Sequence, residues 1–203
     1  MFLVFEGIDG SGKSTQARLL AERLREGRGA DGVLLVREPG GTELGERVRA
    51  LILESREDLS AATELFLFMA ARAHLARRVI APALARGTTV ISDRFVWSSV
   101  AYQGYAGGIE PEQVLAMGRV ATGGLEPDLT FVLDLDPGAA DGRVVDRNRM
   151  EEKGLEYQER VRAGFLALAA SAGDRAAVID GRGTPEEVHD RIVAALERAV
   201  GAS

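Results

Sequence analysis

A glycine-rich segment near the start of the sequence constrains the fold more than any other feature. The segment Gly7–Ser14 has the sequence GIDGSGKS, which matches the pattern G-x-x-x-x-G-K-[ST]. The apolar run Phe2–Phe5 before it predicts a buried strand, and apolar residues at helical spacing predict a helix from Lys13 to about Arg28. Glycines let backbone N–H groups turn around phosphate oxygens, and the positive end of the following helix attracts the same anion. The sequence therefore predicts a nucleoside triphosphate site.

Within this phosphate loop, Lys13 is expected to reach the β- and γ-phosphates, and the Ser14 hydroxyl to bind Mg²⁺. The residues expected to hold the triphosphate are Gly7, Ile8, Asp9, Gly10, Ser11, Gly12, Lys13, Ser14 and Thr15. Kinases, switches and motors share such a loop, so the motif alone does not define the reaction.

Short apolar runs alternate with helical patterns along the rest of the chain. The expected strands cover residues 2–5, 33–36, 88–92, 129–135 and 177–179. The expected helices cover residues 13–28, 43–54, 60–86 with an interruption at Pro82, segments after Phe95 and from Pro111, 155–171, and a last one opening at Thr184. Continuous apolar strands separated by helices are typical of a parallel sheet with helices on both faces, so we expect an α/β fold.

Composition excludes several classes of function. The 203 residues carry a formal net charge of −6, which argues against a sequence-independent grip on nucleic acid. The absence of cysteine removes disulfides, thiolate nucleophiles and Cys-ligated zinc. No apolar run approaches the length of a membrane span. We therefore expect a cytoplasmic protein with no nucleic-acid or membrane partner.

Two further pairs of residues are candidates for binding. Asp93 and Arg94 end the third strand, at the sheet edge where ligands of open α/β folds bind, although a surface ion pair is equally compatible with that position. Asp134 and Asp136 end the fourth strand and are a second choice for a magnesium-binding acid.

Phe68 and Arg72 lie four residues apart on one face of the long helix. Spacing alone favours a core phenylalanine and a surface arginine, and the alternative is a base stacked on the ring and bound by the guanidinium. The arginine-rich segment from Arg143 to Arg149 is either a solvated face or a lid over a transferring phosphoryl group.

Several motifs together resemble the bacterial thymidylate kinases, a family of P-loop nucleoside monophosphate kinases. In chain order they are Phe5–Gly7, Arg37–Thr42, Phe68 with Arg72, Asp93–Phe95, Ser98–Gly104, Arg147–Glu151 and Val178–Asp180. The resemblance covers nearly the whole chain. It implies a five-stranded parallel sheet in one kinase domain over residues 1–203, with a short lid over about 138–153.

The resemblance also implies a reaction, in which dTMP becomes dTDP with ATP and Mg²⁺ as cofactors. Phe68 would stack on thymine, Arg72 would donate to its carbonyl edge, and Tyr102 would pack against C2′ of the sugar. The residues implied to bind dTMP are Asp9, Pro39, Arg49, Phe68, Arg72, Arg94, Ser99, Tyr102 and Gln103. Asp93 would help Ser14 to place Mg²⁺, and Arg182 would border the adenine.

The resemblance assigns catalysis to charge placement rather than to a general base. The residues implied are Lys13, Arg94 and the lid arginines Arg143, Arg147 and Arg149. Gly10 stands where some relatives carry a phosphate-loop arginine, so the lid would supply that charge. The lid segment is several residues shorter than is usual in bacterial members.

Two other functions remain open on the sequence. One is another nucleoside monophosphate or deoxynucleoside kinase with the same core. The other is a nucleotide-dependent switch, although the chain lacks the N-K-x-D base motif of GTPases. The family suggests a homodimer, and the apolar helix segment Leu65–Met69 suits a subunit interface.

Overall fold

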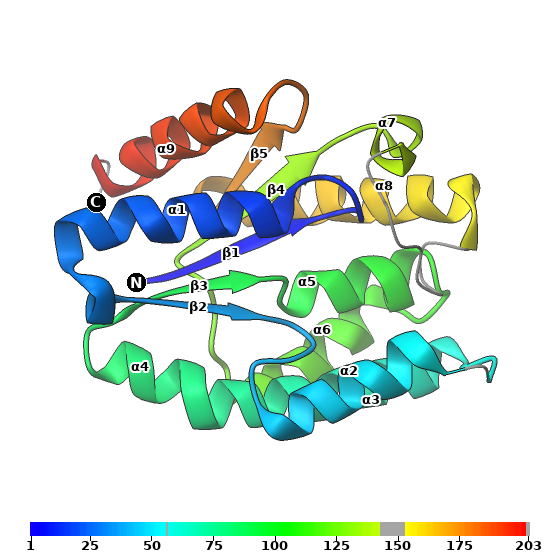
Figure 1. The fold of residues 1–203 in the computed structure, drawn as a ribbon. Helices are drawn as coiled ribbons and strands as arrows, with labels where there is room; N and C mark the ends of the chain where they lie inside the picture. Colours follow the sequence, from blue (N-terminus) through cyan, green and yellow to red (C-terminus); the bar gives the residue numbers. More distant parts are fainter. Residues whose placement is uncertain (56, 143–152, 202–203) are drawn as a thin grey trace.

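The computed structural model describes residues 1–55, 57–142 and 153–201, and within them one parallel sheet organises the chain (Figure 1). The strands are β1 (Phe2–Gly7), β2 (Val33–Arg37), β3 (Thr89–Asp93), β4 (Leu129–Asp134) and β5 (Ala176–Asp180). They lie in the order β2-β3-β1-β4-β5, and every neighbouring pair is parallel. The predicted fold class is confirmed.

Helices cover both faces of the sheet. The helical elements are α1 (Lys13–Arg28), η1 (Ala30–Gly32), α2 (Glu43–Glu54), α3 (Ala61–Leu75), η2 (Ala76–Ile80), α4 (Ala81–Ala85), α5 (Val96–Ser99), η3 (Val100–Tyr105), α6 (Pro111–Thr122), α7 (Pro137–Asp141), α8 (Leu155–Ala172), η5 (Gly173–Arg175) and α9 (Pro185–Gly201). In Figure 1, α1 and α9 lie above the sheet, and α4 and α5 lie below it. Helix α8 packs against η3 and against the face of β4 that η3 also covers. Helices α2 and α3 pack against each other outside that second layer.

The alternation of side chains along β1 divides the core between these two layers. Leu3 and Phe5 pack with the buried face of α1, whereas Phe2 and Val4 pack toward α4. Burying a side chain of this size contributes roughly 1.5–3 kcal/mol. Glu6 falls on the second face by the same alternation, and its carboxylate meets the turn that starts α5.

Local signals in the sequence set the ends of the helices as predicted. The Ser60 side chain accepts a hydrogen bond from the Thr63 N–H at the start of α3. At α9, Thr184 and Glu187 exchange the reciprocal bonds of a capping box. Gly87, at φ +81°, follows α4 and ends the long helical stretch.

The interruption expected at Pro82 takes the form of a π-helical turn. Pro82 has no N–H to donate, so the regular bonding pattern cannot continue through it. The Ala81 N–H bonds instead to the carbonyl of Ala76, five residues earlier. The predicted long helix is therefore three consecutive elements, α3, η2 and α4.

The sheet topology places two loops side by side. Phe5 of β1 is in register with Asp93 at the end of β3, so the phosphate loop and the Asp93–Arg94 turn leave the same edge. The chain leaves β1 toward β2 on one side, and β4 lies on the other. Such a point is where open α/β sheets bind ligands. In the described part of the chain, no helix combines the length and the apolar character that crossing a membrane requires.

Candidate active site

The phosphate loop is fixed by contacts that only glycine allows. Gly7 has φ +139°, and a Cβ there would lie 2.6 Å from the carbonyl oxygen of Leu133. Gly12 has φ +95° and stands immediately before α1. A side chain at either position would be strained, and at Gly7 it would also push β1 from β4. The loop therefore presents its backbone to the mouth of a cavity.

Lys13 is buried in this loop. Its Nζ donates to the Ile8 carbonyl at 2.6 Å and to Ser11 Oγ at 3.4 Å. Burial lowers the pKa of Lys13 to about 8, and the charge of Arg94 adds to that effect against the opposing carboxylates of Asp9, Asp93 and Glu6. An anion in the cavity would oppose this shift, because it favours the charged amine.

Ser14 and Asp93 form the second polar centre of the loop. Ser14 Oγ donates to Asp93 Oδ2 at 2.5 Å, and Asp93 Oδ1 is buried with no hydrogen-bond partner within the described ranges. Both residues line the same cavity. A hydroxyl oxygen beside an unpartnered carboxylate oxygen fits Mg²⁺, which takes few protein ligands and fills its shell with phosphate oxygens and water.

Arg94 connects the two loops. It has φ +73°, unusual for a residue with a side chain, and Ser92 Oγ donates to its carbonyl at 2.7 Å. Its guanidinium forms a very short ion pair with Asp9 and bonds to Ser98 Oγ at 3.1 Å. Tyr102 donates to the other Asp9 oxygen at 2.8 Å. This left-handed conformation costs energy, which is typical of functional turns.

The charges of this group are strongly coupled. Burial alone would raise the pKa of Asp9, but Arg94, ahead of Lys13 and Tyr102, holds it below its usual value. Burial would lower the pKa of Arg94, yet Asp9 raises it, so the guanidinium stays charged. Asp9 therefore presents a carboxylate that already neutralises Arg94.

Glu6 supports Arg94 from behind. Its fully buried carboxylate accepts from the backbone N–H groups of Phe95 and Ser98, at 2.9 and 3.1 Å, and from the Ser98 hydroxyl. Burial raises the pKa of Glu6 to about 7, against the hydrogen bonds from Ser98 and the charge of Arg94. These bonds hold the turn in which Arg94 has its positive φ.

Two cavities meet at Asp9 and Arg94. The smaller, about 100 Å³, lies among α2, α3 and η3, and the larger, about 620 Å³, surrounds the phosphate loop. Of the residues predicted to bind the substrate, those lining the smaller cavity are Asp9, Pro39, Arg49, Phe68, Arg72, Arg94, Ser99, Tyr102 and Gln103. The structure thus brings together every residue of that set.

Arg72 lies at the back of the smaller cavity with only 2% of its surface exposed. Its guanidinium donates to Glu38 at 2.6 Å, to the Phe95 carbonyl at 2.8 Å, to Ser99 Oγ at 3.0 Å and to Met69 Sδ at 3.3 Å. A guanidinium has five N–H groups, so among the described residues these four bonds leave one donor. The alternative that residue spacing favours, a surface arginine at position 72, is therefore wrong.

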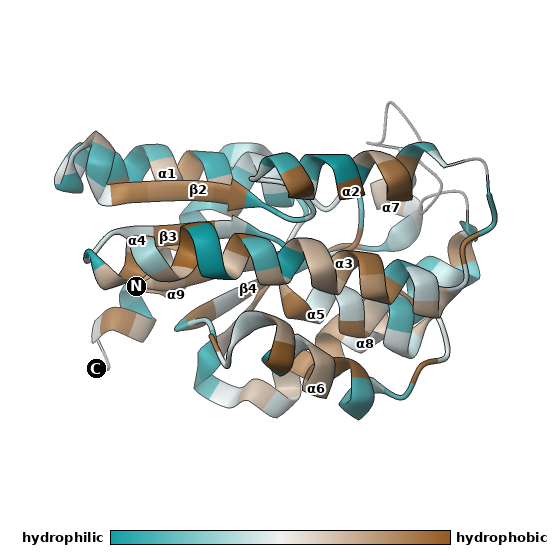
Figure 2. Ribbon diagram, turned by 90° about the horizontal axis from the view of Figure 1, so that it is seen from below, coloured by the Kyte–Doolittle hydropathy of each residue, from teal (hydrophilic) through white to brown (hydrophobic). Residues whose placement is uncertain are grey.

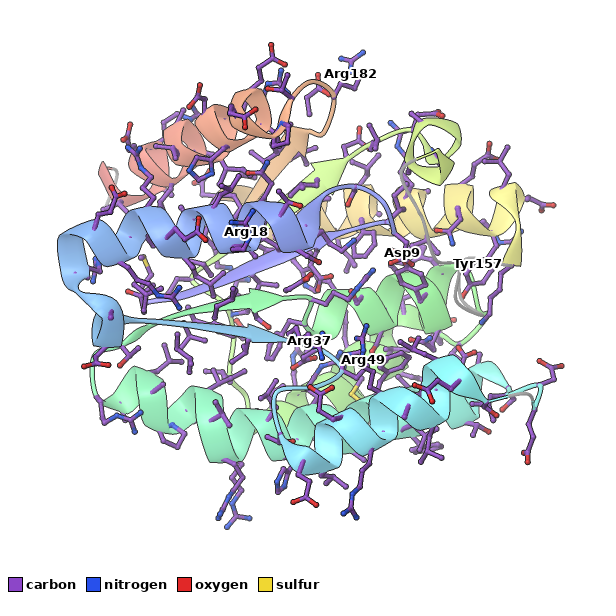
Figure 3. The ribbon with its side chains drawn as sticks, in the orientation of Figure 1. Asp9, Arg18, Arg37, Arg49, Tyr157 and Arg182 are labelled. Atoms are coloured by element: carbon purple, nitrogen blue, oxygen red, sulfur yellow. The ribbon has the colours of Figure 1, made fainter. Side chains whose placement is uncertain are left out.

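Positive charge gathers where the two cavities join. Arg37 at the end of β2 and Arg49 on α2 face the space beside Asp9 (Figure 3), and both line the larger cavity with Arg94. Arg49 bonds to the Pro39 carbonyl at 3.3 Å, and Arg37 is paired with Glu46 at 3.0 Å. Such a cluster attracts phosphate groups.

The comparisons with known proteins agree on one family. The thymidylate kinase family model matches residues 5–192. The chain belongs to the thymidylate kinase family. Curated thymidylate kinases of Chlorobaculum parvum and Cereibacter sphaeroides are 44% and 48% identical to it; the matches cover 97% and 96% of this chain and 95% and 93% of theirs.

A solved structure agrees with this membership of the thymidylate kinase family. The crystal structure of thymidylate kinase from Ehrlichia chaffeensis is 37% identical in sequence and superposes with a TM-score of 0.84. The match covers 97% of this chain and 98% of that one. The P-loop nucleoside monophosphate kinase fold expected from the family is therefore confirmed.

One residue that the family resemblance singled out, Arg182, lines neither of these two cavities. Arg182 does not line the larger cavity, although Gly181 and Gly183 on either side of it do. Its guanidinium is paired with Asp180 at 2.7 Å on an exposed loop, far from Asp9 in Figure 3. The predicted lid arginines Arg143, Arg147 and Arg149 lie outside the described residues.

The buried acidic residues that surround this candidate active site are not among those predicted from the sequence. Glu38 pairs with Arg72, Glu6 holds the Arg94 turn, and Glu64 bonds to Gln103. Each stands directly within or beside a motif, which is a usable signal. Buried carboxylates need a partner, however, and a single sequence does not show which cation or donor supplies it.

Proposed function

We propose that this chain phosphorylates dTMP to dTDP, with ATP as the donor and Mg²⁺ as the metal. The observation that carries the proposal is the meeting of the two cavities at Asp9 and Arg94. A nucleotide in the smaller cavity would direct its phosphate at the triphosphate in the larger one. Membership of the thymidylate kinase family supports the same assignment.

The smaller cavity suits a pyrimidine base. Phe68 offers a ring for stacking, and Arg72 offers one remaining N–H to a carbonyl oxygen. Tyr102, whose hydroxyl is bound to Asp9, fills the space beside the sugar. We assign the base edge to Arg72, Ser99 and Gln103, and the acceptor phosphate to Arg94 with Arg49.

In the larger cavity, the loop residues Gly7–Thr15 would hold the triphosphate. Lys13 would leave its bond to the Ile8 carbonyl and reach the phosphates, where its charge offsets the charge that develops during transfer. Ser14 and Asp93 would hold Mg²⁺, which would supply positive charge to offset that of the phosphates. Arg143, Arg147 and Arg149 complete the set that we propose for catalysis.

The attacking oxygen of dTMP is already ionised, so the site needs no general base. Its work is to bring two anions into line and to exclude water. Arg94 is suited to this because Asp9 keeps it charged and Glu6 fixes its turn. The glycine-rich loop and α1 fix the donor in the same frame.

One assay tests the proposed reaction. ADP release from ATP and Mg²⁺ is measured with dTMP, dUMP, dCMP, dGMP and AMP as acceptors. We expect dTMP to give the highest kcat/KM. Equal activity with dCMP would refute the assignment and favour a general nucleoside monophosphate kinase. ADP release at the same rate with every acceptor would indicate a nucleotide-dependent switch. Family membership argues against that alternative.

We also propose a homodimer that works in the cytoplasm. Phe66 on α3 and Val120 on α6 are 62% and 84% exposed, and Figure 2 shows hydrophobic colour along α3 between α2 and α6. A second copy would cover these side chains. Light scattering should give twice the 21.7 kDa chain mass, and Phe66→Glu should halve it. A monomeric wild type would contradict this proposal.

A further inference from the structure

A buried carboxylate stands behind the base-reading residues of the smaller cavity. Glu64 lies in α3 with none of its surface exposed. Its Oε2 accepts from Nε2 of Gln103 at 3.0 Å, and its two oxygens lie 3.0 and 3.3 Å from Nζ of Lys153. Lys153, whose side chain is 28% exposed, is a cation that pairs with this buried acid.

Glu64 shares a helix face with two residues that line the smaller cavity. Glu64, Phe68 and Arg72 are spaced by four residues, so successive turns of α3 present them on one face. Phe68 and Arg72 line the cavity directly, and Glu64 reaches it through Gln103 on η3. One helix face therefore fixes the stacking ring, the guanidinium and the partner of the amide.

The bond to Glu64 determines which end of the Gln103 amide faces the cavity. An ionised carboxylate has no proton, so it accepts hydrogen bonds and never donates them. Its partner must therefore be the NH₂ group of Gln103, which turns the carbonyl oxygen away from Glu64. Within the described ranges, Gln103 Oε1 accepts no hydrogen bond, and Gln103 lines the cavity.

We propose that Glu64 is a positioning residue that selects a thymine-like base by holding the Gln103 carbonyl toward its N3–H. This rests on the proposed function, because it assumes that the base lies in the smaller cavity. Thymine and uracil carry a proton at N3, whereas cytosine carries a lone pair there. A carbonyl oxygen fixed by Glu64 accepts from the first two bases and repels the third.

The negative charge on Glu64 is what fixes the orientation of the Gln103 amide and so selects between the bases. A neutral amide in its place would bond equally well to either end of Gln103, so the Gln103 side chain could turn to suit cytosine. Lys153 keeps the buried carboxylate paired, which an isolated charge requires. A buried ion pair seldom adds stability over apolar packing, so fixing one orientation is a sufficient reason for its presence here.

The test compares the dTMP-to-dCMP ratio of kcat/KM in wild type and in Glu64→Gln, a change of nearly the same shape. We expect the ratio to fall at least about tenfold, mainly because dCMP becomes a better substrate. Glu26→Gln, an exposed acid on α1, is the control and should leave the ratio unchanged. Glu64→Met, which removes the acceptor altogether, is the second variant, and thermal unfolding checks both.

A double-mutant cycle shows whether Glu64 acts through Gln103. In a Gln103→Leu background, Glu64→Gln should no longer change the ratio. An unchanged ratio in Glu64→Gln, or an equal loss in the Gln103→Leu background, would overturn the inference. Loss of cooperative unfolding in both Glu64 variants would show a purely structural role and overturn it too. A wild type without preference for dTMP would instead refute the proposed function itself.

Discussion

The pKa of Lys13 leads to a sharp expectation for the pH dependence of ATP use. Burial, assisted by Arg94, lowers this pKa to about 8. A lysine is charged below its pKa and neutral above it, so ATP capture should weaken as the pH rises past 8. The parameter kcat/KM for ATP reports ionisations of the free enzyme, and it should show this loss.

The size of the effect follows from the titration of one group. With a pKa near 8, about one tenth of the enzyme keeps Lys13 charged at pH 9. We therefore expect kcat/KM for ATP to fall about tenfold for each further pH unit. Bound phosphates favour the charged amine, so kcat at saturating ATP should stay nearly constant over the same range.

The assay measures ADP release at a dTMP concentration well below its KM, from pH 7.0 to 9.5, where nucleotide phosphates with a pKa of about 6 are mostly ionised. Lys13→Arg is the matched control, because a guanidinium stays charged throughout. Its activity should be lower but without the fall above pH 8. A wild-type profile that stays flat to pH 9.5, or a Lys13→Arg profile that falls in parallel with wild type, would refute the reasoning.

Three further predictions concern the base pocket and the lid. Arg72→Ala should narrow the gap in kcat/KM between dTMP and dCMP. It should also lower the free energy of unfolding by about 3–5 kcal/mol, measured by thermal unfolding, because Glu38 would remain buried and unpaired. A variant that keeps both wild-type selectivity and wild-type stability would contradict the role of Arg72 in the base pocket. Wild type should use dUMP about 10–100-fold less well than dTMP in kcat/KM, since one methyl in an apolar pocket is worth roughly 1–3 kcal/mol; equal use would show that no apolar wall faces C5. Arg149→Ala should lower kcat and kcat/KM by the same factor, with little change in the dTMP affinity measured by calorimetry. A wild-type kcat in this variant would show that Arg149 of the proposed lid takes no part in catalysis.

The sequence alone predicts the framework of the site because local chemistry controls it. Gly7 and Gly12 are required by positive φ and close approach, and Ser60 and Thr184 cap helices through their own side chains. The sequence predicts Asp93 at a strand end, and the register of β1 with β3 brings it to Ser14. Each of these features depends on neighbours in the chain or on the parallel sheet.

The support behind the site could not be predicted in the same way. Arg72 is buried against the general tendency of arginine, because Glu38 and the Phe95 carbonyl reach it from two other segments. The π-helical turn η3, which carries Tyr102 and Gln103, follows a helical pattern that gives no sign of its wider turn. Long-range partners decide both features, and they become visible only when the chain is folded.

The contacts of Asp9 bear on the proposal that Arg94 binds the acceptor phosphate. The Arg94 guanidinium is bound by Asp9 and Ser98, with 19% of its side chain exposed. A phosphate that takes Arg94 must displace Asp9, which would cost energy if that carboxylate were left alone. Tyr102 already donates to the other Asp9 oxygen, and Lys13 adds positive charge nearby, so Asp9 keeps a partner throughout. If Arg94 binds the acceptor phosphate as proposed, binding would therefore exchange one anion for another on a guanidinium that is already held in place.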